Sequence, residues 1–315
     1  MGRAARVLHG RDLSYLRHLN GVTAALSLGL TAGCLAAGLT GCTRSPAQPQ
    51  HPSPGAVSPG RPHPPGTVGS PVPAVTPGPA PGSARWSPRR GEPWQWQLTT
   101  PVDLRPDVPV YDIDAFENSA AVVAELHRLR RRVICYVNVG AAETFRPDHG
   151  SFPPAVLGRA DGWPGERWLD IRRIDVLGPI MAKRFDLCRA KGFDAVEPDL
   201  VEAYPERTGF PLTAADQLRY NRYIARLAHD RGLSVGLKND LGQAGELVGD
   251  FDFAVVEECA QYHECGEALP FVRARKAVLH VEYALPNARF CAETKRLGFS
   301  SMRKRLTLDA PRWPC

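Results

Sequence analysis

Carboxylic acids crowd the segment Gly192–Tyr204, whose sequence is GFDAVEPDLVEAY. Its first residues are mostly apolar and predict a strand. Glu197, Asp199 and Glu202 follow where that strand should end. Like charges this close repel one another, and holding them together costs free energy. Two carboxyl groups, one ionised and one protonated, are the minimum equipment for cleaving a glycosidic bond. The segment is therefore a candidate active site.

Other apolar runs of the chain end in the same way. Nearly every one delivers an ionisable side chain or a tyrosine, and the set is Asp112, Asp114, Glu143, Asp170, Glu197, Asp199, Lys238, Glu257, Glu282 and Tyr283. A single acid at a strand end is usually a helix cap or a solvated loop residue. Because the carboxyl ends of parallel strands meet at one rim, we expect these side chains to surround one mouth. An acidic mouth favours a cationic substrate.

Short apolar runs alternate with segments of helical periodicity along the second half of the chain. The predicted strands are 108–113, 132–139, 168–171, 193–196, 234–237, 253–256 and 277–281, and the predicted helices are 119–132, 176–191 and 213–231. This alternation predicts a parallel α/β sheet, and the length fits a (β/α)8 barrel of the TIM type. Adding 94–98 and 300–306 gives one strand too many. A doubly wound sheet is the alternative, although no G-x-G-x-x-G follows a strand.

Residues 1–41 predict a secretory signal peptide. Arginines precede an uncharged run at 21–41, and Leu39-Thr40-Gly41-Cys42 resembles a bacterial lipobox. The pattern predicts cleavage before Cys42, lipidation of Cys42, and a lipoprotein attached to the outer face of the cell membrane. Cys34 ends a weaker second candidate. A transmembrane helix is the alternative, because the uncharged run is just long enough to cross a bilayer.

Residues 42–90 have the composition of a disordered tether. Prolines are mixed with Gly, Ser, Ala and Gln, and large apolar residues are almost absent before Trp86. Such a segment cannot bury enough apolar surface to offset its ordering entropy. An extended Pro-rich chain would hold a domain away from the membrane. Residues 91–315 then form one globular domain.

Cysteines in an exported domain predict disulfides. The chain has 8 cysteines, of which Cys34 and Cys42 belong to the leader or the lipid anchor. The remaining six can pair in many ways, and the interpretation chosen here is Cys135 with Cys188, Cys259 with Cys265, and Cys291 with Cys315. A zinc site is disfavoured, because the chain has no C-x-x-C.

Charge and motif content exclude several classes of function. The formal net charge is +6, and the leader supplies four arginines against one aspartate, so the exported domain is nearly neutral. No dense basic run with interleaved aromatics points to a nucleic-acid partner. The chain has neither H-E-x-x-H nor G-x-S-x-G. We expect a monomer without metal or cofactor. Two alternatives stay open: a metal-dependent hydrolase or deacetylase using Asp112 and Asp114, and a surface-anchored carbohydrate-binding barrel without catalysis.

A series of motifs resembles the endo-α-1,4-polygalactosaminidase-like glycoside hydrolases of family 114. In chain order they are WQWQL, YDIDAF, VICYVNVGAAE with RPD, WLDI, KGFDAVEPD, GLKND, AVVEEC and VEY. The resemblance covers the chain from Trp94 onwards. It implies a (β/α)8 barrel that cleaves α-1,4-linked galactosamine polymers outside the cell without a metal. A cationic amino-sugar polysaccharide agrees with the acidic mouth.

The resemblance also implies which residues act. The catalytic pair lies in the EPD and EEC motifs, which here contain Asp199 and Glu257. We interpret Asp199 as the nucleophile, because Lys238 would keep it ionised. Glu257 follows an apolar run, so a raised pKa and an acid/base role are expected. Leu200 departs from the polar residue, such as Asn, that the family pattern predicts.

The remaining strand-end residues have expected roles around this pair. Glu197 is the alternative nucleophile, since it lies two residues from Asp199 on the same strand face. We expect retention of configuration, because both carboxyl groups come from strand ends around one narrow mouth. The residues expected to contact substrate are Asp112, Asp114, Glu143, Asp170, Glu197, Lys238, Glu282 and Tyr283.

Overall fold

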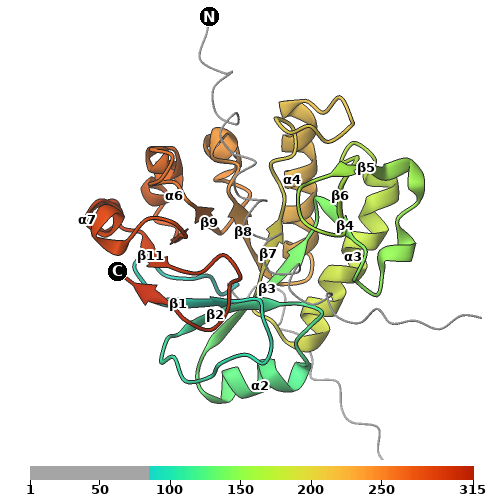
Figure 1. Cartoon of the computed structure of the whole chain (residues 1–315). Coiled ribbons are helices and arrows are strands. Elements are labelled where there is room, and N and C mark those ends of the chain that lie inside the picture. The colour runs from blue at the N-terminus through green and yellow to red at the C-terminus, as the bar shows by residue number, and fades with distance from the viewer. Residues whose placement is uncertain (1–84) are drawn as a thin grey trace, which may run out of the picture. The chain divides into compact units, whose positions relative to one another are not determined.

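Eight parallel strands frame the protein in the computed structural model, which describes residues 85–315 (Figure 1). Each pairs with the next in the order β1 (Trp94–Gln97), β2 (Val110–Asp114), β3 (Arg132–Asn138), β7 (Ala195–Asp199), β8 (Ser234–Lys238), β9 (Phe253–Glu257), β10 (Val278–Glu282) and β11 (Ser300–Arg303). A short β12 (Trp313–Pro314) runs antiparallel to β11. The curled sheet with outer helices confirms the predicted barrel class.

Side chains and loops, rather than a ladder of backbone bonds, bridge β1 and β11. The indole nitrogen of Trp94 donates to the carbonyl of Ser300 at 2.9 Å. The ammonium of Lys304 donates to the side-chain oxygen of Gln95 at 3.2 Å. The backbone nitrogen of Leu98 donates to the carbonyl of Leu308 at 2.9 Å. The sequence analysis gave nine strands when both 94–98 and 300–306 were included. The structure shows that both segments contain barrel strands, β1 and β11.

Helices pack outside the strands, and the first three lie close to the predicted positions, whereas the last three were not predicted. They are α2 (Ala120–Arg128), α3 (Ile174–Lys191), α4 (Ala214–His229), α5 (Ala244–Leu247), α6 (Leu269–Arg273) and α7 (Asn287–Leu297). A capping box starts α4: Thr213 accepts from the backbone nitrogen of Asp216, and the Asp216 carboxylate accepts from the backbone nitrogen of Thr213. Gly192 ends α3 with a left-handed φ of 90°, which glycine adopts freely.

A small antiparallel sheet interrupts the barrel between β3 and α3. It consists of β4 (Ala141–Glu143), β6 (Glu166–Leu169) and β5 (Leu157–Ala160) in that order. The predicted strand at 168–171 therefore belongs partly to β6 and is not a barrel strand. The number of barrel strands predicted from the sequence was too high for this reason, because a short apolar run does not show which strand it will pair with. The side sheet lies beside α3 and α4 in Figure 1.

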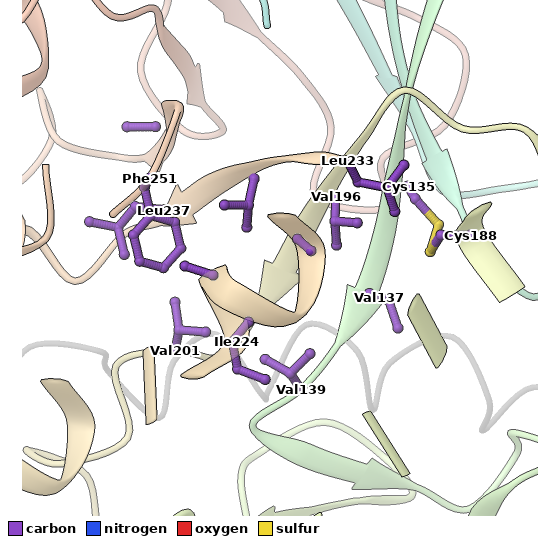
Figure 2. Packing of buried hydrophobic residues seen from close by; sticks show 14 of the residues in the cluster. Cys135, Val137, Val139, Cys188, Val196, Val201, Ile224, Leu233, Leu237 and Phe251 are labelled. Atoms are coloured by element: carbon purple, nitrogen blue, oxygen red, sulfur yellow. A yellow bond between two sulfur atoms is a disulfide. The ribbon is translucent and has the colours of Figure 1, made fainter. Parts of the chain in front are cut away.

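Alternation along the strands divides the buried apolar residues into two clusters. Inward-facing residues, among them Trp94, Trp96, Phe253 and Met302, fill the barrel. The others pack between the strands and the helices. Figure 2 shows part of this outer layer, in which Val196 of β7 and Leu237 of β8 lie near Ile224 of α4. The inward positions at the carboxyl ends of the same strands are polar, and they build the site described below.

All three disulfides expected from the sequence are present. Cys135 of β3 is bonded to Cys188 of α3, as Figure 2 shows, Cys259 to Cys265, and Cys291 of α7 to Cys315. The first closes a loop with a sequence separation of 53 residues. A disulfide of that span typically stabilises a domain by about 2–4 kcal/mol.

The predicted signal peptide, the predicted lipidation site Cys42 and nearly all of the predicted tether lie outside the described residues. Within residues 85–315, no helix combines the length and apolar character needed to cross a bilayer.

Candidate active site

The Lys238 ammonium is the centre of the inward-facing polar residues. It ends β8, and its side chain is only 5% exposed. The ammonium nitrogen lies 2.7 Å from Oδ1 of Asp199 and 2.9 Å from Oε2 of Glu257. It also lies 5.2 Å from the centre of the Trp96 ring, which closes the site from the barrel interior. The structure thus brings together the three residues that the sequence placed at the centre of the active site.

Asp199 is held through both its carboxylate and its backbone. The Tyr136 hydroxyl donates to Oδ2 at 2.7 Å, and the backbone nitrogen of Leu200 donates to Oδ1 at 2.9 Å. The Asp199 carbonyl accepts from the nitrogens of Val139 and Gly140. A Cβ on Gly140 would lie 1.8 Å from the Leu200 carbonyl oxygen, so only glycine allows this approach.

The conformation of Leu200 explains why the family pattern has a residue such as Asn at this position. Its φ is 59°, in the left-handed region that Asn adopts more readily than leucine. The expected polar residue therefore has a backbone reason as well as a possible substrate contact. Leucine keeps the turn at a cost in strain.

Glu257 is surrounded by donors. The Tyr283 hydroxyl donates to Oε1, the Asn239 amide donates to Oε2 at 3.1 Å, and the Lys238 ammonium completes the set. Burial raises the pKa of Glu257, but Lys238, Tyr283 and Asn239 together outweigh burial and hold the pKa below its ordinary value. The raised pKa expected from the apolar run before Glu257 is therefore wrong for the free protein.

The separation of the two carboxylates is limited by the ammonium between them. Oxygens that lie 2.7 Å and 2.9 Å from one nitrogen cannot be farther apart than those contacts laid end to end. The limit holds for the two oxygens that face Lys238, and it favours a narrower spacing than the roughly 6.5–9.5 Å between the carboxyl groups of inverting glycosidases. The spacing is compatible with the roughly 5–5.5 Å of retaining enzymes.

A second carboxyl pair lies deeper in the barrel. Asp112 of β2 and Glu197 of β7 are both 0% exposed, and their side chains hydrogen-bond to each other. Oε1 of Glu197 is 3.8 Å from the Lys238 nitrogen. We call Lys238, Asp199, Glu257, Glu197 and Asp112 the lysine cluster. Asp112 and Glu197 have no exposed surface in the free protein, and their expected role as substrate contacts stays a prediction.

Arginines occupy two other carboxylates that were expected at the mouth. Arg146 binds both Asp114 and Glu143, with its Nε 2.9 Å from Oε1 of Glu143. Arg184 reaches Oε2 of Glu143 at 3.4 Å and binds Asp148 through two hydrogen bonds. We call these five residues the arginine cluster. Asp114 and Glu143 are thus ion-pair partners of Arg146, and the expectation that they contact substrate stays a prediction.

Asp170 and Glu282 also have structural partners. Asp170 lies after β6 of the side sheet, where Arg172 binds it at 2.7 Å. Glu282 is 0% exposed, and Oε1 accepts from the Ala260 backbone nitrogen at 2.8 Å and contacts His280 at 3.0 Å. Its side chain follows His280 on the face of β10 that points away from the barrel interior. Strand position alone does not show which face a side chain takes, and the substrate contacts expected of Asp170 and Glu282 stay predictions.

Several polar residues of the site escaped the sequence analysis. Tyr136 and Asn239 bind Asp199 and Glu257 directly. Tyr136 has the inward parity of Asn138 on β3, and alternation could have identified it. Glu166 and Asp161 form a further acidic pair near Asp199, and burial followed by the Asp161 charge raises the pKa of Glu166 to about 9. Their positions depend on the side sheet, which the sequence did not predict.

Large aromatic side chains are exposed on loops that leave the carboxyl ends of the strands. They are Phe145, Trp163 and Tyr262, with Phe145 58% and Trp163 45% exposed. The backbone nitrogen of Trp163 donates to Asp161, which holds the loop that carries Trp163 next to the Asp161–Glu166 pair. Flat apolar rings next to carboxylates offer both a stacking surface and partners for cationic groups.

The metal-site alternative loses its ligand pair in this structure. Asp112 is bonded to Glu197, whereas Asp114 is bonded to Arg146, so the two carboxylates do not converge on one point. Among residues 85–315, the group of candidate ligands that lies close enough together is Cys259, Cys265 and His280. Its two sulfurs are joined in a disulfide, which removes the thiolates a metal would need.

Comparison with known proteins agrees with the motifs. Ega3 of Aspergillus fumigatus, solved in complex with galactosamine, is 35% identical, with a TM-score of 0.70 over 74% of this chain and 98% of that one. The glycoside hydrolase domain of PelA from Pseudomonas aeruginosa shares the fold at 14% identity, with a TM-score of 0.55 over 70% of this chain and 96% of that one. No curated protein matches. Glycoside-hydrolase family GH114 matches residues 76–315, more than half of the chain. The protein is therefore a glycoside hydrolase and belongs to family GH114.

Proposed function

We propose that the protein is an exported endo-glycosidase that cleaves α-1,4-linked galactosamine polymers with retention of configuration. The observation that carries the proposal is the placement of Asp199 and Glu257 on one ammonium, that of Lys238. Two carboxylates at this spacing can attack and protonate the same glycosidic bond. The similarity to Ega3, a protein solved with galactosamine, supports an amino-sugar substrate.

Asp199 is the proposed nucleophile and Glu257 the proposed acid/base. Lys238, Tyr136 and the Leu200 backbone nitrogen all donate to Asp199 and hold its carboxylate in a fixed orientation. Glu257 is ionised in the free protein because Lys238 is one of its partners. A sugar that enters between the two carboxylates separates Glu257 from Lys238. Burial then dominates, the pKa of Glu257 rises, and the protonated acid forms in the complex.

Acidic and aromatic side chains at the mouth fit a cationic sugar. Glu166 and Asp161 lie near Asp199, and Trp163 stands beside them. We assign the ammonium groups of the polymer to these carboxylates and a sugar face to the indole. This assignment adds to the substrate contacts expected at Asp114, Glu143, Asp170 and Glu282.

Reducing-end release from deacetylated and fully acetylated galactosaminan tests the substrate. We expect hydrolysis of the deacetylated polymer, with no effect of a chelator. Proton NMR of the first product anomer tests the stereochemistry, and the α-anomer is expected. Absence of hydrolysis on both polymers, with a folded protein, would leave the carbohydrate-binding alternative in place. Sensitivity to chelator would favour a metal-dependent reaction.

The export route is a separate proposal. Three disulfides in residues 85–315 favour an oxidising compartment. We propose that Cys42 is lipidated and that residues 42–90 tether a monomeric enzyme to the outer face of the membrane. Changing Cys42 to serine should release the enzyme or leave the precursor uncleaved. Unchanged membrane partitioning and unchanged gel mobility would contradict the lipid anchor.

A further inference from the structure

Two buried acids that face the catalytic residues are left without a role by the proposed mechanism. Asp112 and Glu197 come from different strands, β2 and β7, and both are 0% exposed. Within residues 85–315, none of their four carboxyl oxygens receives a hydrogen bond from an N–H group or a hydroxyl. The remaining hydrogen-bonding neighbour of each carboxyl is the other one, and the Lys238 nitrogen lies 3.8 Å from Oε1 of Glu197. A hydrogen bond between two carboxyl groups requires a proton on one of them.

We propose that Asp112 and Glu197 are a positioning pair that shares one proton, and that this proton keeps the Lys238 ammonium directed at Asp199 and Glu257. The proposal rests on the proposed function, because it assigns the pair a role in that same site. The pair touches neither substrate nor reacting atoms. It acts through Lys238.

Burial is the physical reason for the proton. Two ionised carboxylates in contact without solvent would carry both a desolvation cost and a mutual repulsion. Burial raises the pKa of Asp112 to about 7 and the pKa of Glu197 well above its ordinary value. The charged groups that face the pair are Lys238 of β8, which lowers both pKa values, and Asp199 of β7, which raises them.

The proton matters because one ammonium serves several carboxyl groups. Lys238 lies 2.7 Å from Asp199 and 2.9 Å from Glu257, but 3.8 Å from Oε1 of Glu197. While Asp112 and Glu197 share a proton, the Lys238 ammonium is attracted more strongly to Asp199 and Glu257 than to the pair. Loss of the proton would add a full negative charge below Lys238 and draw the ammonium inward. Asp199 would then lose its main electrostatic partner, and the reaction would slow.

The shared proton has a consequence for stability that needs no substrate to measure. The pKa of Asp112 is about 7 in the folded protein, whereas an aspartate in an unfolded chain has a pKa of about 4. The folded protein therefore binds more protons between those values, and its stability falls as the pH rises through that window. Asparagine at position 112 cannot titrate, so this part of the fall should disappear.

Two substitutions at Asp112 separate hydrogen bonding from packing. In Asp112→Asn the amide donates permanently to Glu197, as the shared proton does. We expect kcat of this variant to be within about threefold of wild type at mildly acidic pH. When the pH is raised to mildly alkaline values, kcat and the melting temperature should fall less in the variant than in wild type. Asp112→Leu removes the donor. We expect its kcat to fall about tenfold or more, with KM within about twofold.

Asp240→Asn is a matched control. Asp240 is also buried, and burial raises its pKa to about 9, but its carboxylate accepts from Asn221 rather than facing Lys238. Its φ of 45° suits asparagine. This variant should change the pH dependence of the melting temperature and leave the shape of the kcat–pH profile as in wild type.

The outcomes separate the pair from the proposed function. Equal losses of kcat in the Asn and Leu variants would mean that Asp112 contributes only by packing, and this would overturn the proposal. A melting temperature of Asp112→Asn that falls with pH as steeply as that of wild type would exclude the shared proton. If Asp112→Leu does not fold, the comparison of Asp112→Asn with wild type decides alone. Wild type that cleaves no galactosaminan, with the expected melting behaviour, would contradict the function but retain the shared proton.

Discussion

The lysine cluster and the arginine cluster are both built from buried charges at the carboxyl end of the barrel, yet their charge ratios differ. Two guanidinium groups face three carboxylates in the arginine cluster, and Arg184 binds Asp148 through two hydrogen bonds. One ammonium faces four carboxyl groups in the lysine cluster. Guanidinium–carboxylate pairs in fixed geometry stabilise a fold. Four carboxyl groups that share one ammonium are not all compensated, so the protonation state of some of them can change, as acid/base catalysis requires.

Exposure is distributed differently in the two clusters. In the arginine cluster the side chains of Arg146, Asp114 and Glu143 are 5%, 4% and 2% exposed, and only the outermost member, Asp148, reaches solvent, at 25%. Asp199 and Glu257 have side chains that are 16% and 21% exposed above an almost buried Lys238. The comparison teaches that a ring of acids at strand ends is not one site. Each acid has to be assigned by its partner and by the face of the strand that carries it.

Removal of either mouth carboxylate should have the largest effect. We expect Asp199→Asn and Glu257→Gln each to lower kcat by about 10³-fold or more, because each deletes an ionisable group and keeps the shape. Azide should partly restore the Glu257→Gln variant by attacking the glycosyl-enzyme, which checks retention. In the arginine cluster, Asp148→Asn is the control and should leave kcat near wild type. A similar loss there would erase the distinction between the clusters.

Breaking the arginine cluster should affect stability instead of chemistry. Arg146→Met leaves Asp114 and Glu143 buried without their cation, and the free energy of unfolding should fall by about 3–5 kcal/mol. Denaturant unfolding measures the change, and kcat of the fraction that stays folded should remain close to wild type. A loss of activity without a loss of stability would indicate that the arginine cluster takes part in catalysis.

Replacing the cation of the lysine cluster should change the pH dependence. Lys238→Met should lower kcat by about 10²-fold, since the charge that stabilises Asp199 is lost. Lys238 is also one of the groups that lower the pKa of Glu257. Without Lys238 the pKa of Glu257 rises and the acid stays protonated to higher pH. The alkaline limb of the kcat/KM profile should therefore shift to higher pH. A limb that stays in place would mean that Lys238 does not control Glu257.

The aromatic rim should contribute least. Trp163→Ala removes an indole that is 45% exposed beside Asp161. Loss of one stacking contact of about 1 kcal/mol corresponds to a rise in KM of roughly fivefold. Steady-state kinetics on the polymer measure it, with kcat expected to stay unchanged. Tyr262→Ala tests the same role on another loop, and equal KM values for all three proteins would exclude stacking at the rim.

Sequence reasoning reached the barrel, the three disulfides and the Asp199–Lys238–Glu257 group because each has a local signature. Apolar runs that alternate with helical periodicity specify strands and helices, and polar residues that follow the runs specify the rim. The sequence did not show the ion pairs of two expected substrate contacts, and this has an equally definite cause. Asp114 and Glu143 are neutralised by Arg146, which becomes their partner only when the side sheet after β3 has folded.

By itself, the sequence determined the order of the strands, the pairing candidates among the cysteines and the chemical types at the strand ends, because these depend on residue identity and on short-range periodicity. Tertiary structure alone decided which carboxyl groups share Lys238, which are bound by arginine, and which are sealed beneath the mouth. Charge and burial act over distance in space, and Asp112 meets Glu197 only when the barrel closes. The pKa of Glu257 is the clearest case: an apolar run predicted a raised value, and Lys238, Tyr283 and Asn239 reversed the direction.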